Sequence, residues 1–312
     1  MTLEADQIVE RRRLKRSRAL WRFGAIAALI LLVLAGSATL GLSTFGLGAH
    51  VARLKITGVI LDNENVVKAI DALAEDDSAE AVLLYVDSPG GTVTGSEAIY
   101  QAVRRVSAKK PVVTVMGSLA ASGGYVVSLA SDHIIAGRNT ITGSIGVIMQ
   151  AIEVSGLLEK IGVSVNEMKS APLKGEPSEF HPLTAEARKA TEVLVADAYD
   201  WFVGLVAERR KLTPEVARTL GDGRVYSGKQ AVQVKLVDEL GDERTARAWL
   251  AQQYHVSERL PARDVDTSGE IPGFGSTQSR ALAALSVLLT GKAFDSKRLT
   301  LDGLVAIWHP AF

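Results

Sequence analysis

The 312-residue chain has no cysteine, and aromatic side chains make up only 5% of its residues. Without cysteine there can be no disulfides, thiolate nucleophiles, iron–sulfur clusters or thiolate-bound zinc. A nucleophile in this protein must therefore be a serine, a threonine, a lysine or a carboxylate. The sequence carries no other motif for a metal or an organic cofactor, and we expect neither.

Net charge is also absent, because 35 basic side chains balance 35 acidic ones. The balance is uneven along the chain: residues 1–49 contain seven basic and three acidic side chains, so the remainder is acidic overall. Nucleic-acid binding depends largely on basic side chains that neutralise phosphates. We therefore expect no nucleic-acid partner.

A run of 27 residues without a charged side chain, residues 23–49, follows the basic cluster. About 20 apolar residues in a helix cross the hydrocarbon core of a bilayer. The basic tail at 1–22 places the N-terminus in the cytoplasm and the main body outside. We predict a single-pass anchor in the cytoplasmic (inner) membrane. The alternatives are a cleaved signal peptide, with small residues at 35–38, and a buried core helix.

Beyond residue 50 the pattern alternates between short β-rich runs and segments of helical spacing. This alternation predicts an α/β fold with a largely parallel sheet. The predicted strands are 51–60, 81–86, 111–116, 145–149 and 163–168. The predicted helices are 66–75, 96–108, 120–130, 154–161, an amphipathic stretch from 184 to 210, and a helix that begins at Thr213-Pro214.

The last fifth of the chain changes composition twice. Residues 262–280 are rich in Gly, Ser, Pro and Asp, as linkers are. The apolar run 281–289 is too short to span a bilayer. We predict a main domain at 50–261, a linker at 262–280 and a C-terminal docking segment at 281–312.

Two glycine-marked turns follow predicted strands, at 87–91 and 117–125. Ligands bind at the carboxyl ends of strands in open α/β sheets, and backbone N–H groups at a helix start stabilise developing negative charge. Ser122 lies between small residues at such a start, where a nucleophile would be accessible. The alternative is that these glycines only form tight turns.

A serine nucleophile needs a base. None of the five histidines has a persuasive carboxylate partner in the sequence; they are His50, His133, His181, His255 and His309. A lysine kept neutral by burial is the other possible base. Lys169 and Lys174 follow a predicted strand and are the candidates, although either could be an ordinary surface lysine.

Residues 223–230, Gly-Arg-Val-Tyr-Ser-Gly-Lys-Gln, match the first seven positions of a phosphate-binding P-loop. Gln230 stands where the motif needs a hydroxyl to hold magnesium, and the glycines do not follow a buried strand. We reject nucleotide binding here.

Taken together, several stretches resemble one family, the bacterial signal peptide peptidase A proteases. These are membrane-anchored Ser–Lys peptidases of the Clp protease and crotonase superfamily. The matching stretches occur in the family's order within residues 55–245. They are Asp87-Ser-Pro-Gly-Gly91, Met116-Gly-Ser-Leu-Ala-Ala-Ser-Gly-Gly-Tyr125, Thr142-Gly-Ser-Ile-Gly-Val147, Lys169-Ser-Ala-Pro-Leu-Lys174, and residues 223–231 with 236–241.

The resemblance implies a Clp protease/crotonase-like spiral β-β-α fold for the predicted domain at 50–261. It implies that Ser122 is the nucleophile, Lys174 the general base and Ser144 the hydroxyl that orients the lysine. The backbone N–H groups of Gly91 and Gly123 would form the oxyanion hole. Two positions depart from the family pattern: Lys235, where glycine is common, and Gly175, where many relatives have Asp.

The resemblance further implies a serine endopeptidase that degrades remnant signal peptides and other apolar peptides. Family members form ring-shaped homo-oligomers at the membrane, with Ser and Lys in some cases supplied by neighbouring subunits. Helices after Thr184 would then make ring contacts. Because a lysine must lose its proton to act as a base, we expect activity to rise with pH on a single limb.

Two other functions remain as alternatives. A crotonase-like acyl-CoA enzyme would use the two glycine turns for a thioester enolate, and it would survive loss of the Ser122 hydroxyl. A noncatalytic membrane scaffold would need neither Ser122 nor Lys174, and it would form no adduct with acylating inhibitors.

Overall fold

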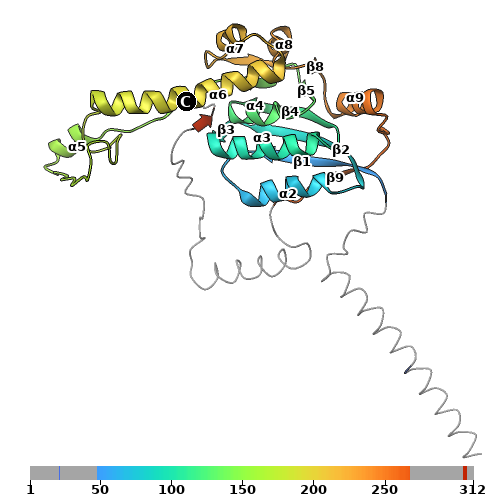
Figure 1. Ribbon diagram of the computed structural model, residues 1–312, viewed down its shortest axis with the longest axis horizontal. Coiled ribbons are helices and arrows are strands. Elements are labelled where there is room, and N and C mark those ends of the chain that lie inside the picture. The colour runs from blue at the N-terminus through green and yellow to red at the C-terminus, as the bar shows by residue number, and fades with distance from the viewer. Residues whose placement is uncertain (1–20, 22–47, 268–304, 308–312) are drawn as a thin grey trace, which may run out of the picture. The chain divides into compact units, whose positions relative to one another are not determined.

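An eight-stranded sheet forms the centre of the fold in the computed structural model (Figure 1). The model describes residues 48–267, Trp21 and the backbone of 305–307, and all but Trp21 and Gly48 belong to one compact unit. The strand order is β7-β6-β4-β2-β1-β9, with β5 also paired to β4 and β8 to β5. The bounds are β1 (His50–Thr57), β2 (Ala79–Ser88), β4 (Val112–Ala121), β5 (His133–Ala136), β6 (Ile141–Gly143), β7 (Val225–Ser227), β8 (Glu239–Leu240) and β9 (Ala262–Asp264).

Every pair in this sheet is parallel except β6–β7. The predicted α/β class with a largely parallel sheet is therefore confirmed. The finer assignment to the Clp protease/crotonase spiral stays a prediction. Strand β9 includes the first three residues of the segment whose composition predicts a linker.

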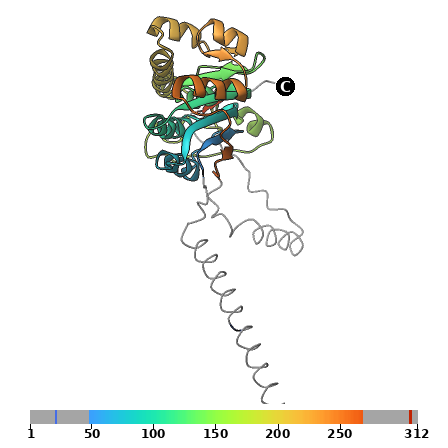
Figure 2. The ribbon, with the colours of Figure 1, turned by 90° about the vertical axis from the view of Figure 1, so that its right-hand side faces the viewer.

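Both faces of the sheet are covered, as the continuous apolar run at 81–86 predicts. Val82, Leu84 and Val86 pack in one core cluster with residues of α2, α3, α4 and α6, whereas Ala81 and Leu83 pack in a second cluster with α9. Figure 2 shows the helices on the two sides of the sheet. Their bounds are α2 (Glu64–Ala74), α3 (Val93–Ser107), α4 (Gly123–Ser128), α6 (Ala185–Arg210) and α9 (Glu243–Tyr254).

Strand β4 pairs with two strands in succession along its length. Val113–Met116 pairs with β5, and Leu119–Ala121 pairs with β6. Because pairing with β6 keeps residues 119–121 extended, the predicted helix 120–130 is wrong at its start and α4 begins only at Gly123. The end of β4 therefore leads directly into Ser122.

The long predicted helix after Thr184 is confirmed as α6, and the helix at Thr213-Pro214 as α7 (Pro214–Leu220). In each case the threonine hydroxyl accepts a hydrogen bond from a backbone N–H of the first turn, Ala187 N at 3.1 Å and Val216 N at 3.4 Å. These are N-cap contacts of the kind that favour helix initiation. A short helix, α8 (Gly228–Gln233), follows β7.

Residues 148–183, which we call the arm, lie largely outside the packed core. The arm contains one helix, α5 (Ser155–Lys160), which confirms the prediction at 154–161. Figure 1 shows α5 at the end of α6 remote from the sheet. The predicted strands at 145–149 and 163–168 are wrong, because neither segment forms a strand: 145–149 contains only an isolated bridge residue, Ile148, and Val163 and Val165 are exposed in the arm.

A second, two-stranded sheet pairs β3 (Gly90–Thr92) antiparallel with β10 (Val305–Ile307), Gly91 lying opposite Ala306. Within the described residues, no helix is both long and apolar enough to cross a membrane. Residues 23–47 of the predicted anchor lie outside the described residues, as does the predicted docking segment at 281–312 apart from the backbone of 305–307.

Candidate active site

Ser122 stands at the junction of β4 and α4 in an unusual backbone conformation. Its φ of 54° and ψ of −119° are rare for a residue with a side chain. Its amide donates a 2.8 Å hydrogen bond to Gly143 O, and the residue is only 1% exposed. Strained turns of this kind need support from the surrounding structure, and they occur often at active sites.

Ser144 follows β6 directly and also has a positive φ, of 48°. Its amide donates a 2.8 Å hydrogen bond to Arg224 O, and the ring of Tyr226 lies against Gly143. The hydrogen bond from Ser122 to Gly143 therefore brings the two predicted serines close together. Residues 223–226, rejected above as a P-loop, support this turn; sequence reasoning missed that role, because it depends on the β6–β7 pairing.

Gly91 lies where no side chain would fit. A Cβ atom on Gly91 would overlap the backbone carbonyl of Ile60. Ile60 bonds Gly90 O and Thr92 N, so the Gly91 amide between them points to the opposite edge of β3, where β10 lies. Helix α4 packs against β3. The structure thus brings the glycine turn at 87–91 to the start of α4, as the sequence predicts.

Gly123 is the first residue of α4, and its N–H lacks an intrahelical partner because it precedes the first helical turn. The Ser122 side chain does not cap the helix either. Such N–H groups can stabilise an oxyanion.

Lys174 lies on the arm, away from the two serines. Its side chain is exposed and makes no hydrogen bond or ion pair within the described part of the chain. In one copy of the chain, the structure therefore brings Ser122, Ser144, Gly91 and Gly123 together. Lys174 belongs instead to the arm, whose helix α5 lies at the end of α6 remote from the sheet (Figure 1).

Lys169, the other candidate base, is surrounded by two carboxylates and a histidine. Its Nζ lies 2.8 Å from Glu167 Oε2, 2.8 Å from Glu176 Oε1 and 3.2 Å from His181 Nε2. A lysine ammonium has three N–H bonds, and two of them have carboxylate acceptors here. The hydrogen bond to Glu167 and then that to Glu176 raise the pKa of Lys169. With a raised pKa, less of Lys169 is in the neutral form that can accept a proton, which leaves Lys174 as the candidate.

The histidines offer no alternative base within the described residues. The His133 ring stacks on Trp249 with centroids 4.6 Å apart, and its Nε2 lies 2.8 Å from Glu239 Oε1. His181 belongs to the Lys169 cluster, and His50 lies near Asp76. Exposed His255 ends α9, and His309 lies outside the described residues.

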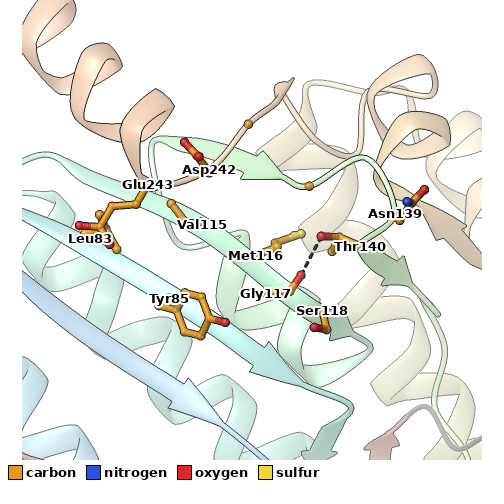
Figure 3. Close-up of a pocket in the computed structure, with 12 residues that line it drawn as sticks. Leu83, Tyr85, Val115, Met116, Gly117, Ser118, Asn139, Thr140, Asp242 and Glu243 are labelled. Carbon is orange, nitrogen blue, oxygen red and sulfur yellow. Dashed lines mark hydrogen bonds between the residues drawn. The ribbon is translucent and has the colours of Figure 1, made fainter.

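A cleft of 530 Å³ opens beside residues 115–118 of β4 (Figure 3). Tyr85, Ser118 and Thr140 are among the residues that line it, and Thr140 Oγ1 donates a 2.7 Å hydrogen bond to Gly117 O. None of the predicted catalytic residues lines this cleft, so it is separate from the candidate active site.

Comparison with known proteins identifies the family. Residues 104–257 match the family model of peptidase family S49. A Synechocystis sp. protein, named provisionally as a protease, is 40% identical over 203 residues, which cover 64% of this chain and 73% of that protein. The chain belongs to peptidase family S49.

Two further relatives of this S49 peptidase have more specific names. An Enterococcus faecium protein, named provisionally as signal peptide peptidase SppA, is 34% identical over 241 residues, covering 73% of this chain and 69% of that protein. The chloroplastic serine protease SPPA of Arabidopsis thaliana is 30% identical over 216 residues, which cover 67% of this chain and 32% of that protein. The predicted resemblance is confirmed: the chain is an SppA-type S49 protease of the serine class.

Proposed function

We propose that this S49 peptidase is a membrane-anchored serine endopeptidase that degrades remnant signal peptides and other apolar peptides. The observation that carries the proposal is the backbone of Ser122, strained at the end of β4 and linked by its amide to the turn that holds Ser144. Residues 23–49 would hold the enzyme in the cytoplasmic membrane with residues 50 onward outside. We further propose that the domain has the Clp protease/crotonase spiral fold.

The proposed reaction is acyl transfer. Oγ of Ser122 attacks the peptide carbonyl carbon while neutral Lys174 takes the hydroxyl proton. The N–H groups of Gly91 and Gly123 bind the oxyanion. The C–N bond then breaks, and the lysine ammonium gives its proton to the leaving amine. Water, deprotonated by Lys174, hydrolyses the ester and regenerates the serine. Ser144 would orient the lysine.

A second copy of the chain would supply Lys174. The arm that carries Lys174 exposes many apolar side chains, including Ile152 at 74%, Ile161 at 63% and Met168 at 100% exposure. Exposed apolar groups on this scale are typical of interaction surfaces. A ring-shaped homo-oligomer would cover the arm, bury Lys174 and so favour its neutral form.

Substrates would bind as an extended strand along β3. This strand already accepts β10 as an antiparallel partner on the edge to which the Gly91 amide points. Added strands gain affinity from backbone hydrogen bonds and are therefore tolerant of sequence. Such binding would place a peptide carbonyl near the proposed oxyanion hole.

Mixing two inactive variants tests the proposal. Ser122→Ala and Lys174→Ala should each abolish cleavage of an apolar signal-peptide fragment. If Ser and Lys come from different copies, co-assembly of the variants should restore about one quarter of wild-type activity, since random mixing pairs an intact Ser with an intact Lys at one site in four. Ser118→Ala, at an exposed serine of β4, and Lys229→Ala, at an exposed lysine, are the controls.

Activity that survives in Ser122→Ala would refute the nucleophile. Two inactive variants that stay inactive after mixing, with assembly intact, would refute the shared site.

A further inference from the structure

Lys174 stands on a turn whose two ends are tied by a side-chain contact. Lys174 N donates a 3.1 Å hydrogen bond to Ala171 O, and Glu176 N donates one of 3.3 Å to Leu173 O. Lys169 precedes this turn and Glu176 closes it, and their side chains form the 2.8 Å hydrogen bond described above. The turn is thus a short loop closed at its base by one ion pair.

Backbone hydrogen bonds do not hold the two sides of this loop together in the described residues. Between residues 164–170 and 176–183, within the arm as described, no backbone–backbone hydrogen bond connects the two sides of the loop. Neither segment is helix or strand. The connections are made by side chains: Lys169 bonds Glu176, and Ser178 Oγ donates a 3.0 Å hydrogen bond to Glu167 Oε1. The loop geometry therefore depends on these contacts.

The ion pair is sheltered from water. The side chain of Glu176 is only 7% exposed and that of Lys169 20%. Oppositely charged groups attract more strongly where water is excluded than on the surface. Oε2 of Glu176 is buried without a hydrogen-bond partner in the described structure, so Lys169 provides the main neutralisation of that carboxylate. Removal of Lys169 would leave Glu176 with only His181 Nε2, 3.1 Å from Oε1, and next to the like-charged Glu167, which favours opening of the loop.

We infer that Lys169 and Glu176 are positioning residues for the S49 reaction: their ion pair holds the loop that presents Lys174 to Ser122 of a second copy. This inference rests on the proposed function. Proton transfer requires the base within hydrogen-bond reach of the hydroxyl. A displacement of about 1 Å costs on the order of 10²-fold in rate.

The test is steady-state kinetics of the assembled full-length enzyme on the signal-peptide fragment. Lys169→Met removes the cation but keeps the length of the side chain. We expect kcat to fall by about 10- to 100-fold with little change in KM, because the loop places the base rather than the peptide. Lys169→Arg keeps the charge and should recover most of kcat. Lys160→Met, at an exposed lysine of α5 on the same arm, is the matched control and should behave as wild type.

Glu176→Gln gives an independent arm of the test, because it preserves shape and removes only the charge. If the two residues act as one pair, the double variant Lys169→Met/Glu176→Gln should lose no more activity than the worse single variant. The double variant would overturn the inference if its losses multiplied.

The outcomes separate this inference from the proposed function. If Lys174→Ala is inactive and Lys169→Met retains wild-type kcat, the positioning role is wrong and the base assignment stands. If Lys174→Ala is active, the proposed function itself fails. If Lys160→Met loses as much kcat as Lys169→Met, or Lys169→Met no longer assembles, the effect belongs to the arm as a whole and the positioning role is overturned.

Discussion

The amide of Ser122 donates a 2.8 Å hydrogen bond to the carbonyl of Gly143, which joins two turns that both require unusual backbone conformations. Ser122, Gly143 and Ser144 have φ values of 54°, 82° and 48°. Positive φ values cost free energy in any residue except glycine. The candidate site therefore stores strain that the sheet around it must offset.

Replacement of Ser122 should expose this strain. We expect Ser122→Gly to be more stable than Ser122→Ala by about 1 kcal/mol, because glycine accepts the positive φ without a steric penalty. Both variants should be inactive. Urea unfolding of the two variants under identical conditions measures the difference, and equal midpoints would mean that the Ser122 turn is not strained.

Gly143→Ala should damage both stability and activity. A Cβ atom there would lie 2.6 Å from Cδ2 of Tyr226, and the φ of 82° is unfavourable for alanine. We expect a loss of about 2 kcal/mol in the free energy of unfolding, together with a strong loss of cleavage. Gly146→Ala is the matched control, since its Cβ would be 3.7 Å from Gly223 Cα at an ordinary φ. A stable, active Gly143→Ala variant would contradict the close packing of β6 on Tyr226.

Lys235, one of the two departures from the family pattern, also has a positive φ, of 63°. Lys235→Gly should therefore raise the free energy of unfolding by about 1 kcal/mol. The carbonyl of Lys235 accepts a 2.7 Å hydrogen bond from Arg210 Nε, a contact that the substitution keeps. Activity should not change. Thermal unfolding at matched protein concentration checks the prediction, and a lower midpoint would refute it.

The sequence predicts most of the central fold. Local signals predict one strand and two helices: the apolar run 81–86 lies in β2, and threonine caps begin α6 and α7. Such signals depend only on residues close together in the sequence. The apolar alternation at 163–168 misleads, because a β pattern forms a strand only where a partner strand is available. Conversely β6, β7 and β10, of three residues each, are too short to predict and form through pairing alone.

The sequence predicts part of the candidate site, the serine and glycine turns, but does not settle which lysine is the base. Glycine-marked turns after strands point to Ser122 and Gly91 from local pattern. The residues alone predict that Lys174, in a loop with Pro172, is the more sheltered lysine, and this is wrong within one chain, where Lys174 is exposed and Lys169 is 20% exposed. The contacts of Lys169 with Glu167, Glu176 and His181 distinguish the two lysines, and these contacts form only in the folded arm.

The ion pairs of Lys169 with Glu167 and Glu176 should persist over the pH range of ordinary assays. Hydrogen bonds from Lys169 lower the pKa of Glu167 and of Glu176, so their contributions are complete above about pH 4.3 and are lost on acidification below it. The raised pKa of Lys169 places its loss above about pH 10.4. His181 and, through it, Glu153 also face this cluster.

Hydrogen exchange of amides 170–176, corrected for intrinsic rates, should show constant protection between pH 6 and 9 and a loss near pH 4. Loss of protection between pH 6 and 9 would contradict this assignment.

The pH dependence of catalysis can then be assigned. Because a lysine base must be neutral, kcat/KM should rise on one limb as the pH increases, and this limb cannot come from the ion pairs of Lys169 with Glu167 and Glu176. Lys169→Met should be slower than wild type by the same factor at each pH from 6 to 9. A flat profile from mildly acidic to alkaline pH would count against Lys174 as the base.

Strand β3 has Ile60 on one edge and β10 on the other, so its second edge is not vacant when a peptide arrives. An incoming strand must displace residues 305–307 before it can pair there. Because residues 305–307 belong to the same chain, they compete with a peptide at an effective concentration that does not fall when the protein is diluted. Peptides that make only a few backbone hydrogen bonds will then show apparent affinities weaker than their intrinsic ones. Longer apolar peptides, which gain additional contacts, will be selected over short fragments.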